Sequence, residues 1–373
     1  MKEKGNAIFT IGFLSSIILV FTIVDFFTGD RLFSETENRL LALKPKFSVE
    51  ELFFGSYTSD YEKYVTDQFV GRDKWIYMKT ETDVLLQKKT INGVYLGSGN
   101  YLIEQHLPQD YPEELENKRL ELLERLVTEW DATVMLVPTA DNILTDKLPA
   151  YAPYYDEKAL LEKVAQMAGE KQYVDVYAIL REHSREEIYY RTDHHWTSLG
   201  AYYGYLAWAE TVGEEPYPYD VEGMVTVSED FLGTLHSKLN LNRVGDRLQY
   251  FPETTVRAPR LTYDLTVETE SYYEESYLET KNKYGFFLDD NHALIEIDTG
   301  YRNGKTLFVL KDSYANSFVP LLAPHYEKIY VVDLRYFNGK LFSLMEQYTP
   351  EAGMDVLVLY KCIHFLEEFS YFA

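Results

Sequence analysis

The chain has 373 residues, of which 46% are hydrophobic and 26% charged, a composition typical of a globular protein with a substantial core. Its formal net charge of −24 argues against a nucleic acid as partner, because binding to phosphates requires clustered Lys and Arg. The single cysteine, Cys362, excludes both an intramolecular disulfide and a thiolate metal cluster.

The first predicted element is an uncharged apolar segment over residues 7–24. Its length is close to the ~20 residues that a helix needs to span a membrane. Lys2 and Lys4 precede it and predict that this end lies in the cytoplasm. We therefore expect a single-pass anchor within residues 1–30 at the cell membrane, with the rest of the chain extracytoplasmic. A cleaved signal peptide is the alternative, although no clear small-x-small cleavage site follows the apolar run.

The next segment, residues 31–90, reads as a helical lead-in to one large domain over residues 91–373. Apolar residues recur at near-helical spacing between residues 49 and 86. Asn92-Gly93 then marks a turn, and short apolar stretches on either side of residues 98–100 predict a hairpin.

The large domain alternates short apolar runs with helical stretches. Uninterrupted apolar runs are typical of strands buried on both faces, and their alternation with helices predicts a parallel sheet flanked by helices, an α/β fold. Residues from about 220 to 299 break the pattern and read as a β-rich insertion or sheet extension. The helices are predicted over residues 118–130, 159–167 and 199–211, and the strands over residues 133–137, 174–177, 307–310, 329–332 and 356–359.

Ser313 follows one of these strands directly and precedes a predicted helix. Functional groups in an open α/β sheet lie just past the carboxyl ends of the strands. The hydroxyl would therefore point into the crevice, with free N–H groups of the helix start available to an oxyanion. The alternative is a serine that only caps the helix.

A second polar run, Asp193-His194-His195-Trp196, stands just before another predicted helix. Asp193 and His195 can lie on one face of an extended segment, so that the carboxylate accepts from Nδ1 and leaves Nε2 free to take a hydroxyl proton. Metal ligation by the paired histidines is an alternative that no HExxH-like spacing supports. A purely structural role for the run is the other alternative.

Ser313, His195 and Asp193 together supply a nucleophile, a base and a carboxylate that orients the base. They come from two different strand ends of the predicted sheet. This combination is typical of acyl transfer through a covalent serine ester.

The run TDHHWTSLGAYYGY, residues 192–205, resembles the signature of the DHHW protein family, which belongs with the alginate O-acetyltransferase-like proteins of the SGNH-hydrolase superfamily. The resemblance extends over nearly the whole chain after the anchor. Further stretches that look like family blocks are SETENRLLALKPKFS, the D-x-F-x-G-R-D pattern of residues 67–73, INGVYLG, VPTADNILTDKLP, KDSYANSFVPLLAPHY and VVDLRYF.

The resemblance implies an SGNH-hydrolase-like fold and an O-acetyltransferase that modifies an exported or cell-surface polysaccharide through an acetyl-serine intermediate. Asp193 and His195 match the family's Asp-x-His motif, and Ser313 matches the serine of its Asp-Ser-[Tyr/Phe] motif. A membrane-bound O-acyltransferase would be the partner that donates the acetyl group. No metal or other cofactor is expected. The further groups expected to contact the oxyanion or the substrate are His194, Tyr314, Asn316, Asn142 and Arg335.

Two other functions are alternatives. A carbohydrate acetyl esterase would run the same chemistry with water as the acceptor. A non-catalytic scaffold for glycan binding or export would not need the Ser313, His195 and Asp193 set at all. The choice between a transferase and an esterase depends on whether the site excludes water and binds a sugar.

Overall fold

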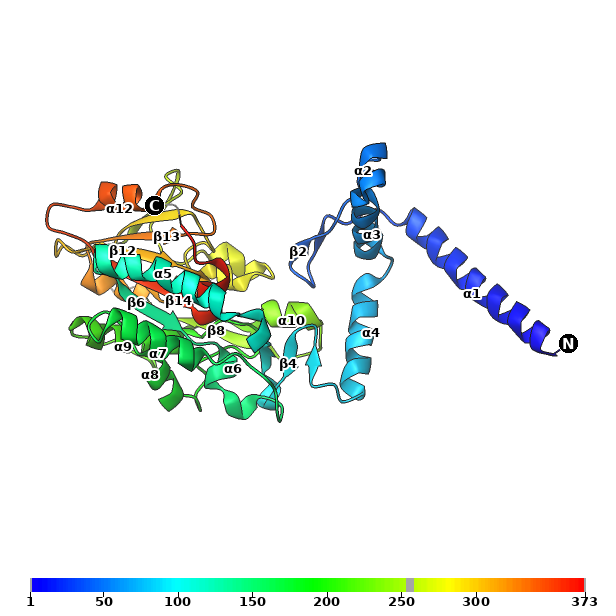
Figure 1. Ribbon diagram of the computed structural model, residues 1–373, viewed down its shortest axis with the longest axis horizontal. Helices are drawn as coiled ribbons and strands as arrows, with labels where there is room; N and C mark the ends of the chain where they lie inside the picture. Colours follow the sequence, from blue (N-terminus) through cyan, green and yellow to red (C-terminus); the bar gives the residue numbers. More distant parts are fainter. Residues whose placement is uncertain (1, 253–257, 372–373) are drawn as a thin grey trace. The chain divides into compact units, whose positions relative to one another are not determined.

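The computed structural model describes residues 2–252 and 258–371 (Figure 1). The chain divides into two compact units. Unit 1 comprises Met1–Lys88 with Ser237–Asn242, and unit 2 comprises Lys89–His236 with Arg243–Ala373. Parts of three predicted regions lie outside the described residues: residue 1 of the anchor, residues 253–257 of the insertion and residues 372–373 of the large domain.

Unit 1 begins with a long helix, α1, Lys2–Phe27. Its segment Ile8–Asp25 is long and apolar enough to cross a membrane, and none of that segment is buried. A signal sequence near the N-terminus has the same length and composition. The other elements of unit 1 before residue 89 are β1 (Phe33–Ser34), β2 (Arg39–Leu40), α2 (Val49–Phe54), α3 (Ser56–Gln68) and α4 (Arg72–Leu85).

The single helical pattern predicted for residues 49–86 is therefore three helices. Gly55 and Gly71 separate them, and both adopt the left-handed conformation, with φ of 84° and 67°. Glycine is the residue that takes this conformation without steric cost. Gly55 therefore ends α2 and starts α3, and Gly71 starts α4.

Ion pairs join two of the stretches that look like family blocks. The Arg39 guanidinium donates to both carboxylate oxygens of Asp67, at 2.9 and 2.6 Å. Arg72 donates to both oxygens of Glu37, at 2.5 and 3.1 Å. The hydrogen bond from Arg39 lowers the pKa of Asp67 to about 2. These ion pairs join the segment SETENR to the D-x-F-x-G-R-D segment inside unit 1.

Unit 2 is built on a seven-stranded sheet in the order β10-β9-β11-β13-β12-β14-β6 (Figure 1). β13, β12, β14 and β6 are parallel, whereas β11 and β9 join antiparallel and extend the sheet to β10. The predicted α/β fold is confirmed, with the antiparallel strands making the sheet mixed. The strands are β6 (Thr133–Val137), β9 (Arg260–Tyr263), β10 (Val267–Thr269), β11 (Leu294–Asp298), β12 (Thr306–Lys311), β13 (Lys328–Asp333) and β14 (Asp355–Lys361).

Helices bury both faces of this sheet, which explains the uninterrupted apolar runs. Along β6, Met135 and Val137 pack into the core on the side of α8, α9 and α11, and Val134 and Leu136 pack on the side of α5, α7, α12 and α13. The helices of unit 2 outside α10 are α5 (Glu113–Trp130), α6 (Ala140–Ile143), α7 (Glu157–Ala168), α8 (Val176–Glu182), α9 (Ser198–Val212), α11 (Val319–Leu322), α12 (Leu341–Tyr348) and α13 (Cys362–Glu368).

The predicted strand over residues 174–177 is wrong. A single parallel bridge joins Tyr173 to Val134, and α8 begins at Val176. The Asp175 carboxylate accepts a hydrogen bond from the N–H of Ala178 and so caps the helix. This local cap outweighs the β propensity of the apolar residues.

The predicted hairpin around residues 98–100 is confirmed, and the insertion has two parts. The hairpin lies in a three-stranded sheet, and β9, β10 and β11 of the insertion extend the main sheet, whereas β7 and β8 form a separate antiparallel pair. The elements outside the main sheet are β3 (Thr90–Ile91), β4 (Val94–Leu96), β5 (Leu102–Glu104), β7 (Val225–Phe231), α10 (Thr234–Leu239) and β8 (Asp246–Tyr250).

A buried polar network lies beside β6. The His106 ring makes contacts of 3.0 Å from Nδ1 to Asp141 and 3.3 Å from Nε2 to Glu104. Glu157 accepts from the N–H and the hydroxyl of Thr139, each at 2.7 Å, and the same hydroxyl also contacts Asp141. One hydroxyl proton cannot serve two carboxylates. Burial and the neighbouring Asp141 raise the pKa of Glu157 to about 8. A protonated Glu157 supplies the second proton that these oxygen contacts need.

Glu157→Gln, which mimics the protonated acid, is expected to gain stability relative to the wild type as the pH rises from 5 to 8. The wild type holds a proton on Glu157 that the unfolded chain has lost above about pH 4.3. The free energy of unfolding of the wild type therefore falls by up to about 1.4 kcal/mol for each pH unit in this range. The variant has no such loss, because its amide does not titrate. Chemical denaturation at several pH values measures the difference. Glu162→Gln, an exposed position on the same helix, serves as the control, and parallel curves for wild type and Glu157→Gln would contradict the prediction.

Candidate active site

Ser313 stands at the carboxyl end of a central strand. β12 ends at Lys311, and a 3₁₀ turn over Ser313–Ser317 follows. The cap of this turn is Asp312, whose Oδ1 accepts from the N–H of Tyr314 at 2.9 Å. Capping is therefore done by the aspartate, and the serine hydroxyl is engaged elsewhere.

The three residues predicted from separate motifs form one chain of hydrogen bonds. His195 Nε2 lies 2.8 Å from Ser313 Oγ, and His195 Nδ1 lies 2.5 Å from Asp193 Oδ1. All three residues are buried, with Ser313 6% exposed and His195 4%. This geometry matches a nucleophile, a base and an orienting carboxylate.

Asp193 is held as a carboxylate by several donors. Its Oδ2 accepts from the N–H and the hydroxyl of Thr234, at 2.7 and 3.0 Å, and its Oδ1 accepts from the N–H of His195 at 3.0 Å. Burial raises the pKa of Asp193, but its electrostatic interactions with His195 and His194 and these hydrogen bonds outweigh burial and hold it well below its usual range. The carboxylate can thus accept from Nδ1 of His195 at neutral pH.

Gly233 leaves the space that Asp193 occupies. A Cβ at position 233 would stand 2.2 Å from Asp193 Oδ2 and 2.3 Å from Asp193 Cβ, so a side chain there displaces the acid. Gly233→Ala is expected to lower the turnover of p-nitrophenyl acetate by about 10²-fold, because ~1 Å misplacement of a catalytic group costs that much. Gly29→Ala, where nothing lies within 4 Å, is the control. Unchanged turnover in Gly233→Ala would show that Asp193 does not depend on this space.

Two further contacts tie the acid–base loop to the serine turn. Trp196 is fully buried and donates from Nε1 to the carbonyl of Tyr314 at 2.9 Å. Tyr314 in turn donates from its hydroxyl to the carbonyl of His194. The tryptophan and the tyrosine of the two motifs therefore hold the loops in register, so that His195 faces Ser313.

The imidazole of His195 is packed between two rings. The Tyr284 ring lies parallel to it, with centroids 3.8 Å apart and an interplanar angle of 9°, and the His194 ring lies 3.9 Å away on a 36° tilt. The Tyr284 hydroxyl donates to the carbonyl of Ser313 at 3.2 Å. Tyr284 comes from the predicted insertion, which therefore contributes directly to the site.

Asp312 contacts an imidazole, that of His364. Its Oδ2 accepts from the N–H of Lys361 at 3.0 Å and lies 2.8 Å from Nδ1 of His364. Burial raises the pKa of Asp312, whereas the hydrogen bond from His364 and the electrostatic interaction with it lower that pKa to well below the usual range. The residue that precedes Ser313 in the sequence thus belongs to an Asp–His pair of its own.

Of the further predicted contacts, His194 and Tyr314 lie at the site, and the other three side chains bond elsewhere. Asn316 accepts from Lys311 and donates to the carbonyl of Asp290. Asn142 bonds to Asp141, Tyr155 and Glu157 in the buried network, and Arg335 bonds both oxygens of Asp333. Within residues 2–252 and 258–371, none of these hydrogen bonds reaches Ser313, His195 or Asp193.

Two groups of side chains bring metal-ligand atoms within 4.8 Å of one another: Asp193 with His194 and His195, and His106 with Asp141 and Glu157. In the first group, both ring nitrogens of His195 already make hydrogen bonds. A cation bound there would have to replace the bonds that join His195 to Asp193 and Ser313. The hydrogen-bonded arrangement favours proton transfer at this place.

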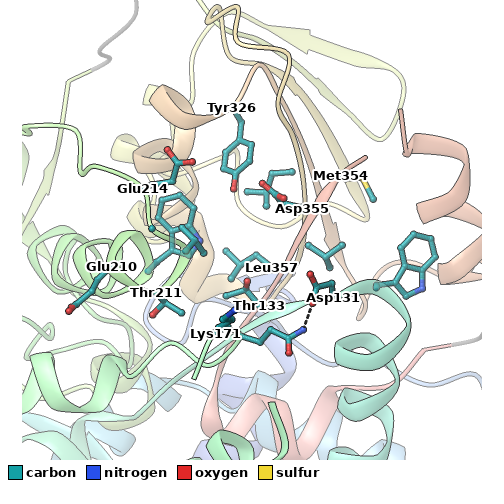
Figure 2. Close-up of a pocket in the computed structure, with 17 residues that line it drawn as sticks. Asp131, Thr133, Lys171, Glu210, Thr211, Glu214, Tyr326, Met354, Asp355 and Leu357 are labelled. Atoms are coloured by element: carbon teal, nitrogen blue, oxygen red, sulfur yellow. Dashed lines mark hydrogen bonds between the residues drawn. The ribbon is translucent and has the colours of Figure 1, made fainter. Parts of the chain in front are cut away.

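A cavity of about 540 Å³ lies at the other end of the sheet (Figure 2). Its lining includes Thr133, Leu307 and Asp355, at the starts of β6, β12 and β14. Gln172 and Asp131 also line it, and Gln172 donates to the Asp131 carboxylate at 2.6 Å. Figure 2 marks a hydrogen bond of the labelled Asp131 with a dashed line. This cavity lies at the amino ends of the strands, whereas Ser313 follows the carboxyl end of β12, so the two are separate. Ligands of open α/β sheets bind at the carboxyl ends.

Sequence reasoning missed Gly233, Thr234, Tyr284 and His364. Each lies far in the sequence from a predicted residue that it contacts in the folded chain. No spacing or motif distinguishes it from other Thr, Tyr, Gly or His residues.

The family model described as DHHW protein matches residues 117–332, more than half of the chain. No curated protein matches the sequence.

Among solved structures, a DHHW family protein from Eubacterium siraeum is 25% identical, with a TM-score of 0.62 over 74% of this chain and 93% of its own. Bacillus cereus PatB1, described with a sulfonyl adduct, shares the fold at 20% identity, with a TM-score of 0.58 over 75% of this chain and 100% of its own. The O-acetyltransferase domain of Pseudomonas putida AlgJ is more distant, at 17% identity and a TM-score of 0.46, over 74% and 94% of the two chains. Since the family model spans the acid–base loop and the serine turn together, the chain belongs to the DHHW protein family.

Proposed function

We propose that this protein is an extracytoplasmic O-acetyltransferase that modifies an exported or cell-surface polysaccharide through an acetyl-Ser313 intermediate. The observation that carries the proposal is the continuous hydrogen-bond chain from Ser313 Oγ through His195 to Asp193. The family resemblance of the motifs supplies the substrate class.

In the first half of the reaction, Ser313 Oγ attacks the carbonyl carbon of an acetyl donor while its proton passes to His195 Nε2. Asp193 stabilises the imidazolium that forms. The tetrahedral intermediate collapses, the bond to the donor's leaving group breaks, and the leaving group takes the proton from His195. The products are acetyl-Ser313 and the free donor carrier.

The second half reverses the roles. A sugar hydroxyl gives its proton to His195 Nε2 and attacks the acetyl carbonyl carbon, the bond to Ser313 Oγ breaks, and Oγ recovers the proton. The Tyr314 N–H already donates to Asp312. We therefore assign the role of backbone donor to the oxyanion to the Ser313 N–H, at the start of the turn.

The N-terminal helix fits the proposed place of the reaction. α1 would anchor the chain in the cell membrane as a single pass, with unit 2 outside the cytoplasm. A membrane-bound O-acyltransferase would then present the acetyl group to Ser313 in the same membrane. PatB1 is described with a sulfonyl adduct. For this protein we expect a loss of p-nitrophenyl acetate turnover on treatment with phenylmethanesulfonyl fluoride.

An esterase is the second candidate, because water can replace the sugar hydroxyl in the second half-reaction. The test uses the full chain in detergent micelles with p-nitrophenyl acetate, with and without cellopentaose and chitopentaose. Acetylated oligosaccharide, detected by mass spectrometry, supports the transferase. Release of free acetate alone, at a rate that oligosaccharides do not change, supports the esterase. Absence of p-nitrophenol release from folded protein would contradict both and favour the scaffold.

A further inference from the structure

Two imidazoles lie beside the proposed relay without a part in it. His194 stacks on His195 with ring centroids 3.9 Å apart, and the rings of His194 and His364 lie 6.0 Å apart. Their side chains are 17% and 14% exposed, more than His195 at 6%. Both rings are therefore partly open to molecules from solvent, and we call them the imidazole pair.

Hydrogen bonds fix the tautomer of His194. Its Nδ1 lies 2.6 Å from the hydroxyl of Thr234, and that hydroxyl donates its only proton to the carboxylate of Asp193 at 3.0 Å. A charged acceptor takes the stronger bond, so the hydroxyl accepts from Nδ1–H of His194. Burial and the neighbouring His195 lower the pKa of His194, which keeps the ring neutral. Its Nε2 is then a bare acceptor.

The same reasoning applies to His364. Its Nδ1 lies 2.8 Å from the carboxylate of Asp312, which can only accept, so Nδ1 carries the proton. Burial and the nearby charge of Lys361 lower the pKa of His364. In the part of the chain that the structure describes, neither Nε2 of the imidazole pair makes a hydrogen bond. Two acceptors therefore stand unpaired, one on the ring that packs on His195 and one on the ring that contacts Asp312.

We propose that the imidazole pair, His194 Nε2 and His364 Nε2, binds hydroxyl groups of the acceptor sugar and so directs the acetyl group to sugar instead of water. A hydroxyl donates to a bare imidazole nitrogen, and two such acceptors on neighbouring rings suit a polyhydroxylated ring. This inference rests on the proposed function and names the residues that select its acceptor.

The reaction step itself is unchanged by the imidazole pair. One sugar hydroxyl attacks the carbonyl carbon of acetyl-Ser313 and passes its proton to His195 Nε2, which returns it to the departing Oγ. Other hydroxyls of the same sugar donate to His194 and His364 and keep their protons. The imidazole pair thus binds the acceptor, and acylation of Ser313 does not require it.

Substitution by asparagine separates the two functions of His364. The Asn side chain can still donate to Asp312 from the place of Nδ1 but offers nothing at the place of Nε2. His183→Asn is the matched control, because His183 Nδ1 contacts Glu186 at 2.7 Å in an imidazole–carboxylate pair on another part of the surface. His364→Ala, which also removes the donor to Asp312, shows whether that bond matters on its own.

The experiment loads the full chain in micelles with p-nitrophenyl acetate and then adds cellopentaose, chitopentaose or glucose. Quenched samples give the amount of acetyl-Ser313 and the ratio of acetyl-sugar to acetate. We expect His364→Asn to form acetyl-Ser313 at a rate within about twofold of the wild type. The ratio of transfer to hydrolysis is expected to fall about tenfold, the loss of roughly one hydrogen bond to the acceptor. His183→Asn is expected to match the wild type.

The possible results separate this inference from the proposed function. An unchanged transfer-to-hydrolysis ratio in His364→Asn would overturn the inference and leave the acetyl-serine mechanism intact. Wild-type protein that forms acetyl-Ser313 but transfers to none of the three sugars would also overturn it. A wild type without acetyl-Ser313 would overturn the proposed function and this inference with it.

Discussion

Replacing Ser313 by alanine is expected to lower the rate of p-nitrophenyl acetate turnover by about 10⁴- to 10⁶-fold, the loss seen when a serine nucleophile is removed from a relay of this kind. The structure gives the reason: Ser313 Oγ is the atom that His195 Nε2 contacts, at 2.8 Å. Without the hydroxyl, no covalent acetyl intermediate can form. Release of p-nitrophenol in a continuous absorbance assay measures the loss.

The control for this substitution is Ser317→Ala on the same turn. The Ser317 hydroxyl lies 3.3 Å from the Tyr284 hydroxyl, and among the described residues it makes no hydrogen bond to His195. Its removal therefore changes the turn but keeps the proposed nucleophile. We expect turnover within about threefold of the wild type, the cost of a weak neutral hydrogen bond. Equal turnover in Ser313→Ala and wild type, with both folded, would remove Ser313 from the reaction.

Asp193→Asn is expected to lower turnover by about 10³- to 10⁴-fold with little change in the position of the ring, as for other relays in which the orienting carboxylate becomes an amide. An amide at position 193 can donate to Nδ1 of His195 and so favours the tautomer with its proton on Nε2, which cannot act as a base. It also removes the charge that stabilises the imidazolium. The same assay measures the loss.

Asp264→Asn provides the matched comparison, because Asp264 contacts Nδ1 of His292 at 2.9 Å in another Asp–His pair. Its substitution is expected to leave turnover unchanged. If Asp193→Asn also left turnover unchanged, His195 would have to work without an orienting carboxylate, and the relay drawn from the sequence would be wrong.

The parallel part of the fold could be predicted because burial on both sides of a sheet leaves a mark in the sequence. The apolar runs of β6, β12, β13 and β14 have no polar alternation, and each lies in the sheet as predicted. The predicted strand over residues 174–177 failed because Asp175, a single capping residue, starts a helix within it. The insertion could not be resolved into its two parts, since whether its strands join the main sheet depends on long-range pairing.

The candidate site was predictable to the extent that its residues lie within short motifs. Ser313, His195 and Asp193 each stand next to a helix start or a strand end, and those positions follow from local sequence. The groups that hold them do not. Gly233 and Thr234 surround Asp193, and Tyr284 packs on His195, from a segment whose sequence reads only as β-rich. Their contribution comes from packing between distant parts of unit 2.

The amide side chains show the opposite error. Asn142 and Asn316 carry the group expected of an oxyanion donor, but their hydrogen bonds go to Glu157 and Lys311 in the interior. A buried amide must satisfy its own donors and acceptors first, and the sequence does not show which partners stand nearby. The proposed site therefore consists of the relay, the Ser313 N–H and the imidazole pair.

Peptide mass spectrometry of the full chain, quenched during turnover of p-nitrophenyl acetate, tests the central claim most directly. The account predicts that the peptide containing Ser313 carries one acetyl group in the wild type, and that His195→Ala and Asp193→Asn accumulate far less of it. It also predicts that added oligosaccharide discharges this acetyl group as acetyl-sugar. An acetyl group on another residue, with Ser313 unmodified in an active wild type, would contradict the account.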